Sequence, residues 1–136
     1  MSAVAIARRF VNAINRHDTD AMSALMTEDH RLVDPGGAII AGRLRVVEAW
    51  EAYFRMVPDY TITVSESYAR EDTSVVLGKA SGSYVAPDGR RCGTWECPAA
   101  WRAATSNGRV EEWQVFADNE PIRALMRESA IPEDHA

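Results

Sequence analysis

The sequence predicts an α+β domain in which three N-terminal helices and a short C-terminal helix pack on a strongly curved, mixed or antiparallel sheet. Apolar residues recur at helical spacing up to Pro58 and with period two after Tyr60. The 136 residues can form one sizeable core, and no linker, repeat or low-complexity segment divides them. We therefore expect a cone-shaped barrel over residues 1–129 and a polar tail at 130–136.

Two amphipathic helices are predicted at the N-terminus. In the first, the apolar residues that share one face are Val4, Ala7, Phe10, Val11 and Ile14. Asp18 is a good N-cap for a short second helix, because its side chain can accept from free backbone N–H groups. The second helix is expected to bury Met22, Leu25 and Met26.

A short strand, a turn and a third helix are predicted next. Residues 31–33 form the strand, the Pro35-Gly36-Gly37 run forms the turn, and residues 38–41 form a brief partner strand. The helix after Gly42 carries one apolar stripe, and Pro58 ends it because proline lacks the backbone N–H that would continue it. The stripe consists of Val46, Val47, Trp50, Phe54 and Val57.

The second half of the chain predicts four antiparallel strands and a last helix. The strands begin at Tyr60 and continue at 75–85, 91–104 and 110–117. Turn signals separate them, of which Asn107-Gly108 is the most specific, since both residues tolerate positive φ. Pro98 suggests a bulge or a sheet edge within the third of these strands. Asp118 or Asn119 is expected to cap the final helix.

Composition excludes several classes of partner. The net charge is −5 and no dense Lys/Arg cluster occurs, so we expect neither nucleic acid nor membrane as a partner. The N-terminus continues a helical pattern and does not resemble a signal peptide. Cys92 and Cys97 are predicted to face opposite sides of one strand and to stay reduced. A cytoplasmic protein without a metal or other cofactor is expected.

Six short motifs occur in order along the chain: residues 10–18, residues 25–30, Val33-Asp34-Pro35, residues 41–43, residues 108–113 and Phe116-Ala117-Asp118. Together they resemble the SnoaL-like branch of the nuclear transport factor 2-like superfamily over residues 4–126. That superfamily consists of cone-shaped α+β barrels and includes ketosteroid isomerase, limonene epoxide hydrolase and scytalone dehydratase. The resemblance implies a small-molecule pocket but not one activity, because the fold hosts many functions.

The resemblance places Asp34 at the position of the general base of ketosteroid isomerase, which also precedes a proline. The two oxyanion-hole donors of that enzyme fall at Phe10 and near Ala99, which carry no hydrogen-bond donor in their side chains. Steroid isomerisation by that mechanism is therefore not expected, because losing one such donor typically costs roughly 10²–10³ in rate. Without catalysis, Asp34 would be a turn residue that hydrogen-bonds the following loop.

Other candidate site residues come from the same reasoning. His30 could shuttle protons near the pocket, or it could be a half-exposed strand-end residue. Tyr53 could present its hydroxyl to a ligand, although aromatic residues at helical spacing usually belong to the core. Glu111 is a weak candidate for a second acid. The expected pocket-lining residues are Phe10, Trp50, Phe54, Trp95, Cys97, Ala99, Trp101, Trp113 and Val115.

Two main functional hypotheses follow. In the first, the chain is an isomerase, cyclase, dehydratase or hydratase that acts without a cofactor on a small apolar or polycyclic carbonyl compound. In the second, it is a non-catalytic, dimeric ligand-binding module; a protein-transport adaptor is a less supported third option. A homodimer is expected through the outer sheet face, where Thr94, Glu96 and Arg102 could contribute. Several positioned donors around Asp34 would favour catalysis.

Overall fold

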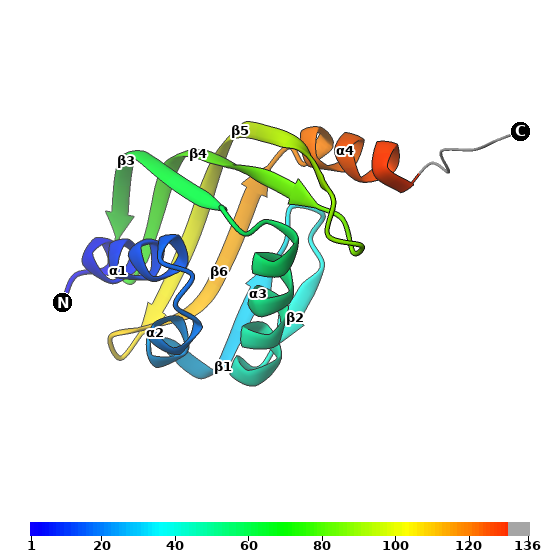
Figure 1. The fold of residues 1–136 in the computed structure, drawn as a ribbon. Coiled ribbons are helices and arrows are strands. Elements are labelled where there is room, and N and C mark those ends of the chain that lie inside the picture. Colours follow the sequence, from blue (N-terminus) through cyan, green and yellow to red (C-terminus); the bar gives the residue numbers. More distant parts are fainter. Residues whose placement is uncertain (131–136) are drawn as a thin grey trace, which may run out of the picture.

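The computed structural model describes residues 1–130 and shows helices packed against one six-stranded sheet (Figure 1). The predicted α+β class is confirmed. The helices are α1 (Ala3–Asn15), α2 (Thr19–Ala24), α3 (Arg43–Met56) and α4 (Glu120–Ala130). The strands are β1 (Met26–Val33), β2 (Ile39–Ala41), β3 (Thr61–Arg70), β4 (Thr73–Val85), β5 (Arg91–Ser106) and β6 (Arg109–Ala117). Residues 131–136 of the expected tail lie outside the described residues.

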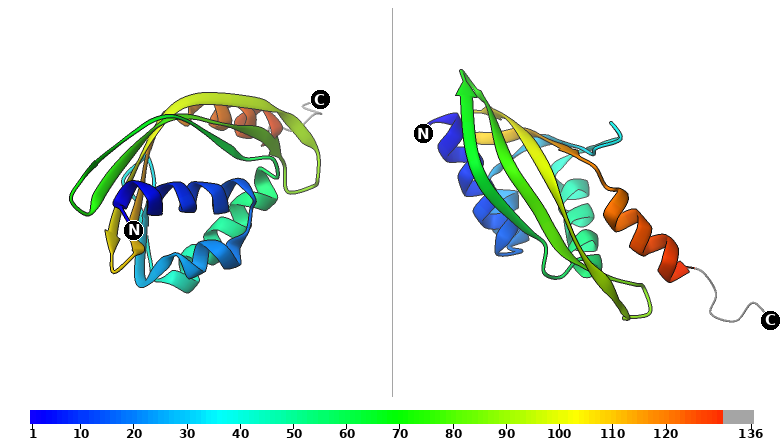
Figure 2. Two further views of the ribbon diagram at one scale, coloured as in Figure 1. Left: turned by 90° about the vertical axis from the view of Figure 1, so that its left-hand side faces the viewer. Right: turned by 90° about the horizontal axis from the view of Figure 1, so that it is seen from above.

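The sheet is mixed and strongly curved, and it stays open. Its strand order is β2-β1-β6-β5-β4-β3, so β2 and β3 form its two edges and no hydrogen bonds close a barrel. The β1–β6 pair is parallel and the other pairs are antiparallel. The sheet bends over α1, α2 and α3, whereas α4 packs beyond the end of β6 against β5 and β4 (Figure 2).

One strand boundary differs from the sequence-based prediction. Met26 begins β1 rather than ending α2, because it pairs with Val110, and the Leu25 carbonyl accepts from the Val110 N–H at 2.7 Å. The polar run between Met26 and His30 conceals this strand in the sequence, since only those two residues of the run are buried. The remaining elements match their predicted order.

A bulge in β6 decides which side chains face the helices. Glu111 is the extra residue, because Ala104 pairs with Glu112 and Thr105 with Val110. Val110 and Trp113 are therefore both fully buried although they are three positions apart. Glu112 lies on the outer face, where it pairs with Arg31 and Arg102. Pro98 pairs with Lys79 without a register shift, and β6 ends opposite Ala99, so Pro98 marks an edge and not a bulge.

None of the helices within residues 1–130 is long and apolar enough to span a membrane. Both cysteines are free: Cys97 is buried and Cys92 is partly exposed. The cytoplasmic location stays a prediction.

Candidate functional site

An apolar cavity of about 250 Å³ opens between α3 and the end of the sheet at which β1 and β6 finish. Its lining residues are Leu32, Asp34, Pro35, Ile40, Ala49, Trp50, Tyr53, Tyr60, Ala80, Trp95, Cys97, Val115, Ala117 and Asn119. Asp34 is the only charged side chain among the described residues that line it. Because Asp34 is exposed whereas Trp50 and Tyr60 are buried, the acid marks the rim of the cavity.

The turn after β1 fixes the Asp34 carboxylate. Its Oδ1 accepts hydrogen bonds from the backbone N–H groups of Gly36 and Ala38, both at 2.9 Å. Its own backbone N–H donates to the Ala38 carbonyl, also at 2.9 Å. Oδ2 has no hydrogen-bond partner within residues 1–130. One oxygen thus holds the turn, and the other is available to a ligand or to water.

Two tyrosines line the same cavity. The rings of Tyr53 on α3 and Tyr60 ahead of β3 lie 5.1 Å apart, edge to face. Burial raises the pKa of Tyr53, and the nearby Cys97 acts in the same direction. Burial likewise raises the pKa of Tyr60, so both phenols are protonated at neutral pH and can donate. Period two places Tyr60 on the same face as Ile62, a signal that could have identified it from the sequence.

Cys97 adds a thiol to the cavity lining, and this thiol has low reactivity. Burial raises the pKa of this thiol, and the negative charges of Asp118 and Glu96 act in the same direction. A protonated buried thiol is a poor nucleophile. Asp118 itself accepts from the Glu120 N–H at 2.9 Å and thereby caps α4, as predicted.

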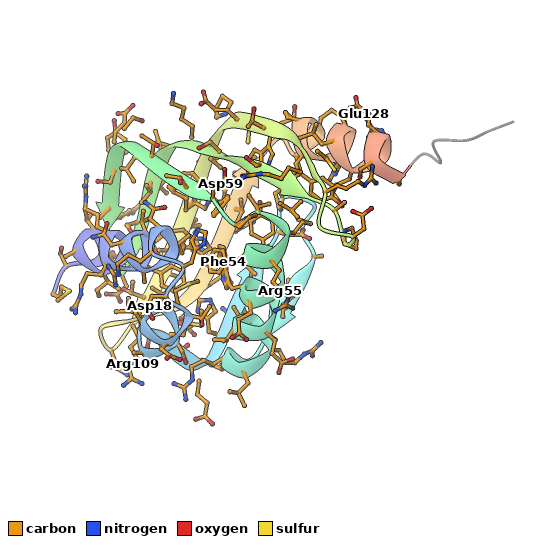
Figure 3. The ribbon with its side chains drawn as sticks, viewed as in Figure 1. Asp18, Phe54, Arg55, Asp59, Arg109 and Glu128 are labelled. Atoms are coloured by element: carbon orange, nitrogen blue, oxygen red, sulfur yellow. The ribbon has the colours of Figure 1, made fainter. Side chains whose placement is uncertain are left out.

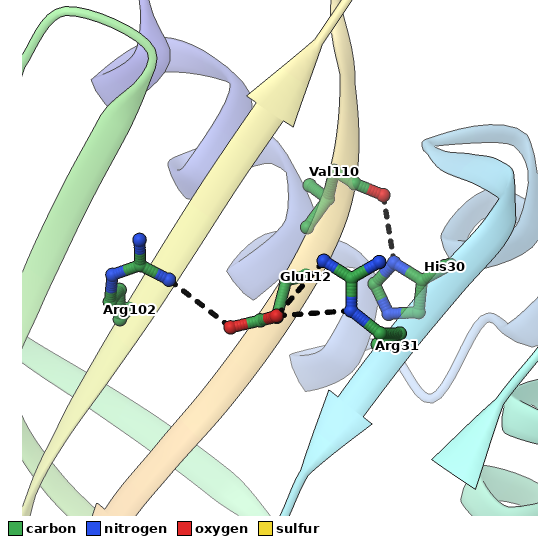
Figure 4. A network of polar contacts seen from close by, with 5 residues as sticks. All are labelled: His30, Arg31, Arg102, Val110 and Glu112. Carbon is green, nitrogen blue, oxygen red and sulfur yellow. Dashed lines mark hydrogen bonds and ion pairs between the residues drawn. The ribbon is translucent and has the colours of Figure 1, made fainter. Parts of the chain in front are cut away.

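His30 lies in the core and not at the cavity. It is fully buried, and its Nδ1 lies 2.7 Å from the Val110 carbonyl oxygen (Figure 4). A carbonyl oxygen only accepts, so Nδ1 carries the proton and Nε2 is a bare acceptor. Nε2 has no partner in the described part of the chain. Burial lowers the pKa of His30, which keeps the imidazole neutral.

Of the twelve residues predicted for the site, six line the cavity: Asp34, Trp50, Tyr53, Trp95, Cys97 and Val115. The other six lie elsewhere, because α1 and several rings fill one half of the curved sheet. Phe10 packs on Trp113 with ring centroids 4.9 Å apart, and Trp101 is fully buried beside them. Phe54 stacks on His17 at 4.1 Å. Ala99 packs against the same core without lining the cavity, and buried His30 is the sixth. Glu111, the further acid candidate, is taken up by the bulge.

The outer face of the sheet carries an ion-pair triad. Glu112 bonds Arg31 on β1 and Arg102 on β5, each at 3.1 Å (Figure 4). The Glu112 side chain is only 18% exposed, although it lies on the open face. No group of three or more His, Cys, Asp or Glu residues within residues 1–130 is arranged to hold a metal ion.

The chain is similar to a known domain family and to several solved structures. The SnoaL-like domain family matches residues 7–113. A proposed SnoaL-like polyketide cyclase from Shewanella denitrificans superposes with a TM-score of 0.81 at 12% identity, covering 93% of this chain and 97% of that one. IdmH, a proposed polyketide cyclase from Streptomyces antibioticus, gives 0.78 at 19% identity, with 93% and 99% covered.

A third structure has a ketosteroid isomerase-like fold and contains trimethylamine. This protein from Catenulispora acidiphila has a TM-score of 0.75 and 19% identity, with 96% of each chain covered. None of the curated proteins matches the sequence. At these identities, the structural likenesses show the fold alone.

Proposed function

The chain belongs to the SnoaL-like domain family. We propose that its cavity binds a small, mainly apolar molecule that carries an acceptor oxygen. Asp34 would remove a proton from this molecule. The observation that carries this proposal is the Asp34 carboxylate, whose Oδ1 is anchored by two N–H groups and whose Oδ2 is unpartnered within residues 1–130. A base held in one orientation by its own turn needs no rearrangement before it accepts a proton.

The chemistry that fits this arrangement is proton abstraction next to a carbonyl. The C–H bond breaks, its proton goes to Asp34 Oδ2, and the electron pair moves into the carbonyl to give an enolate. The hydroxyls of Tyr53 and Tyr60 would donate to that oxygen. Isomerisation, cyclisation and dehydration can all begin with this step, which requires no cofactor.

The test uses β-tetralone, a bicyclic ketone with exchangeable α-protons. In deuterium oxide, NMR should show that the protein accelerates α-deuteration, and Asp34→Asn should reduce that acceleration by about 10²–10⁴. Asparagine keeps an acceptor Oδ1 for the Gly36 and Ala38 N–H groups, so the variant should fold normally. Equal acceleration by both proteins would refute Asp34 as the base.

A non-catalytic binding module is the second candidate. It is favoured by the exposure of Asp34 and by its hydrogen bonds within its own turn, which a purely structural turn residue would share. Quenching of the fluorescence of Trp50 and Trp95 by β-naphthol measures binding without chemistry. Binding by the wild-type protein without deuteration of any ketone in a panel would favour this candidate.

We also propose a homodimer through the outer sheet face. Phe116 and Tyr68 lie on this face and are 50% and 57% exposed, so both side chains could be covered by a partner there. The Arg31–Glu112–Arg102 triad orders three charged side chains on the same face before any partner arrives. Such preordering lowers the entropy lost on association.

A further inference from the structure

We propose that a second site, at the opposite end of β6 from the cavity, binds the phosphate group of a small phosphorylated ligand. The site is the arginine groove, a hollow between α1, α2 and the β5–β6 turn. Its lining residues are Arg9, Asn12, Arg16, Ala21, Ala24, Leu25, Asn107, Gly108 and Arg109. Figure 3 shows Arg109 at this turn, close to α2.

The charge of the groove carries the inference. Arg9, Arg16 and Arg109 come from α1, its C-cap and the first position of β6. Among the described residues, no carboxylate lines the hollow. None of the three forms an ion pair within residues 1–130. Three such guanidinium groups in one hollow are notable in a chain of net charge −5. Guanidinium groups bind phosphate oxygens through paired N–H donors.

The floor of the groove is fixed and leaves space. The Val110 N–H donates to the Leu25 carbonyl at 2.7 Å and thereby ties β6 to the end of α2. Ala21 and Ala24 contribute only small side chains. Asp18 lies beside the groove, but its Oδ1 accepts from the Ala21 N–H at 3.0 Å and is occupied in capping α2. The amides of Asn12 and Asn107 add neutral donors.

The groove is distinct from the cavity. Arg109 begins β6 and Ala117, a cavity residue, ends it. A strand of 9 residues spans roughly 26 Å at about 3.3 Å per residue. Phosphate binding in the groove therefore does not depend on whether Asp34 acts as a base.

Isothermal titration with inorganic phosphate, pyrophosphate and phenyl phosphate tests the proposal. At low ionic strength, pyrophosphate should bind with a Kd below about 1 mM, and added salt should weaken it severalfold. Arg16→Gln with Arg109→Gln should weaken binding at least about tenfold. Comparable binding of phenyl phosphate would identify the phosphate of an ester as the ligand group, whereas binding of only the inorganic anions would assign the site to free phosphate.

The control is Arg45→Gln with Arg55→Gln, which removes the same charge from exposed arginines of α3. It should change the Kd less than about twofold, and Asp34→Asn should leave the Kd unchanged. Equal losses in both double variants would mean that binding follows net charge alone, and this would overturn the proposal. Absence of binding of any phosphate at millimolar concentration would also overturn it. Arg9→Gln provides an independent test if the groove double variant unfolds.

Discussion

At the scale of single residues, His30 illustrates how burial fixes a protonation state. The imidazole is fully buried, Nδ1–H donates to the Val110 carbonyl, and the ring lies 5.9 Å from Phe10. Protonation would place an uncompensated charge on Nε2, which has no partner in the described structure. Burial therefore lowers the pKa of His30 from 6.5 in the folded state, although the Val110 carbonyl opposes this effect.

This environment predicts acid sensitivity. Because the folded pKa lies below the unfolded value of 6.5, the unfolded chain binds more protons below that pH. The contribution of His30 to stability is thus complete above pH 6.5 and is lost as the pH falls toward the folded pKa. Urea unfolding at about pH 7.5 and about pH 5.5 should show a loss of about 1 kcal/mol in the wild-type protein. In His30→Phe the loss should be smaller; an equal loss would contradict the assignment.

At the scale of elements, the periodicity of apolar residues predicts which side chains share one face of a helix or strand. The alternation of Trp95, Cys97 and Trp101 correctly places them on the inner face of β5. The bulge at Glu111 could not be predicted, since it depends on how β5 and β6 align across the hairpin. Likewise, the polar start of β1 becomes a strand only because Met26 pairs with Val110. Both departures are tertiary effects that override local pattern.

The candidate site follows the same division. Asp34 and Tyr53 could be selected from the sequence because the turn and the helical stripe define their positions. The sequence could not predict that one half of the inner face is filled and the other half open, since this depends on where α1 lies across the sheet. Phe10 therefore contacts Trp113 instead of a ligand, and His30 is enclosed with them.

The β3–β4 pair makes a prediction about close backbone approach. A Cβ at Gly78 would lie 1.9 Å from the Thr63 carbonyl oxygen, which is impossible without a shift of backbone. Gly78→Ala should therefore lower the free energy of unfolding by at least about 2 kcal/mol. Ser81→Ala on the same strand should change it by less than about 0.5 kcal/mol. Similar urea midpoints for the two variants would show that the strands separate at little cost.

At the scale of the whole molecule, the open sheet has one covered and one uncovered face. The inner face is covered by α1, α2 and α3 (Figure 2). The cavity lies on this side, whereas the outer face exposes Phe116 and Tyr68 and carries the charged triad. If two copies associate through the outer faces, the two cavities remain accessible on opposite sides. Dimerisation and ligand binding are then independent properties.

Replacing Phe116 tests the dimer. Phe116→Glu should give a monomer in size-exclusion chromatography with light scattering, because a carboxylate would be buried against its own copy. β-Naphthol binding should persist in the variant, since Phe116 does not line the cavity. Exposed Leu44 on α3 provides the control, and Leu44→Glu should leave the mass unchanged. A monomeric wild-type protein would exclude the outer-face dimer.

The most direct measurement of the central claim is a crystal structure with β-tetralone bound. If Asp34 is the base, the ketone should lie in the cavity, with its oxygen within hydrogen-bond distance of the Tyr53 or Tyr60 hydroxyl. Its α-carbon should lie about 3–3.5 Å from Asp34 Oδ2, the distance at which a proton can be transferred. A ketone bound with its α-carbon turned away from Asp34, or a cavity closed by its own side chains at saturating ketone, would rule out Asp34 as the base.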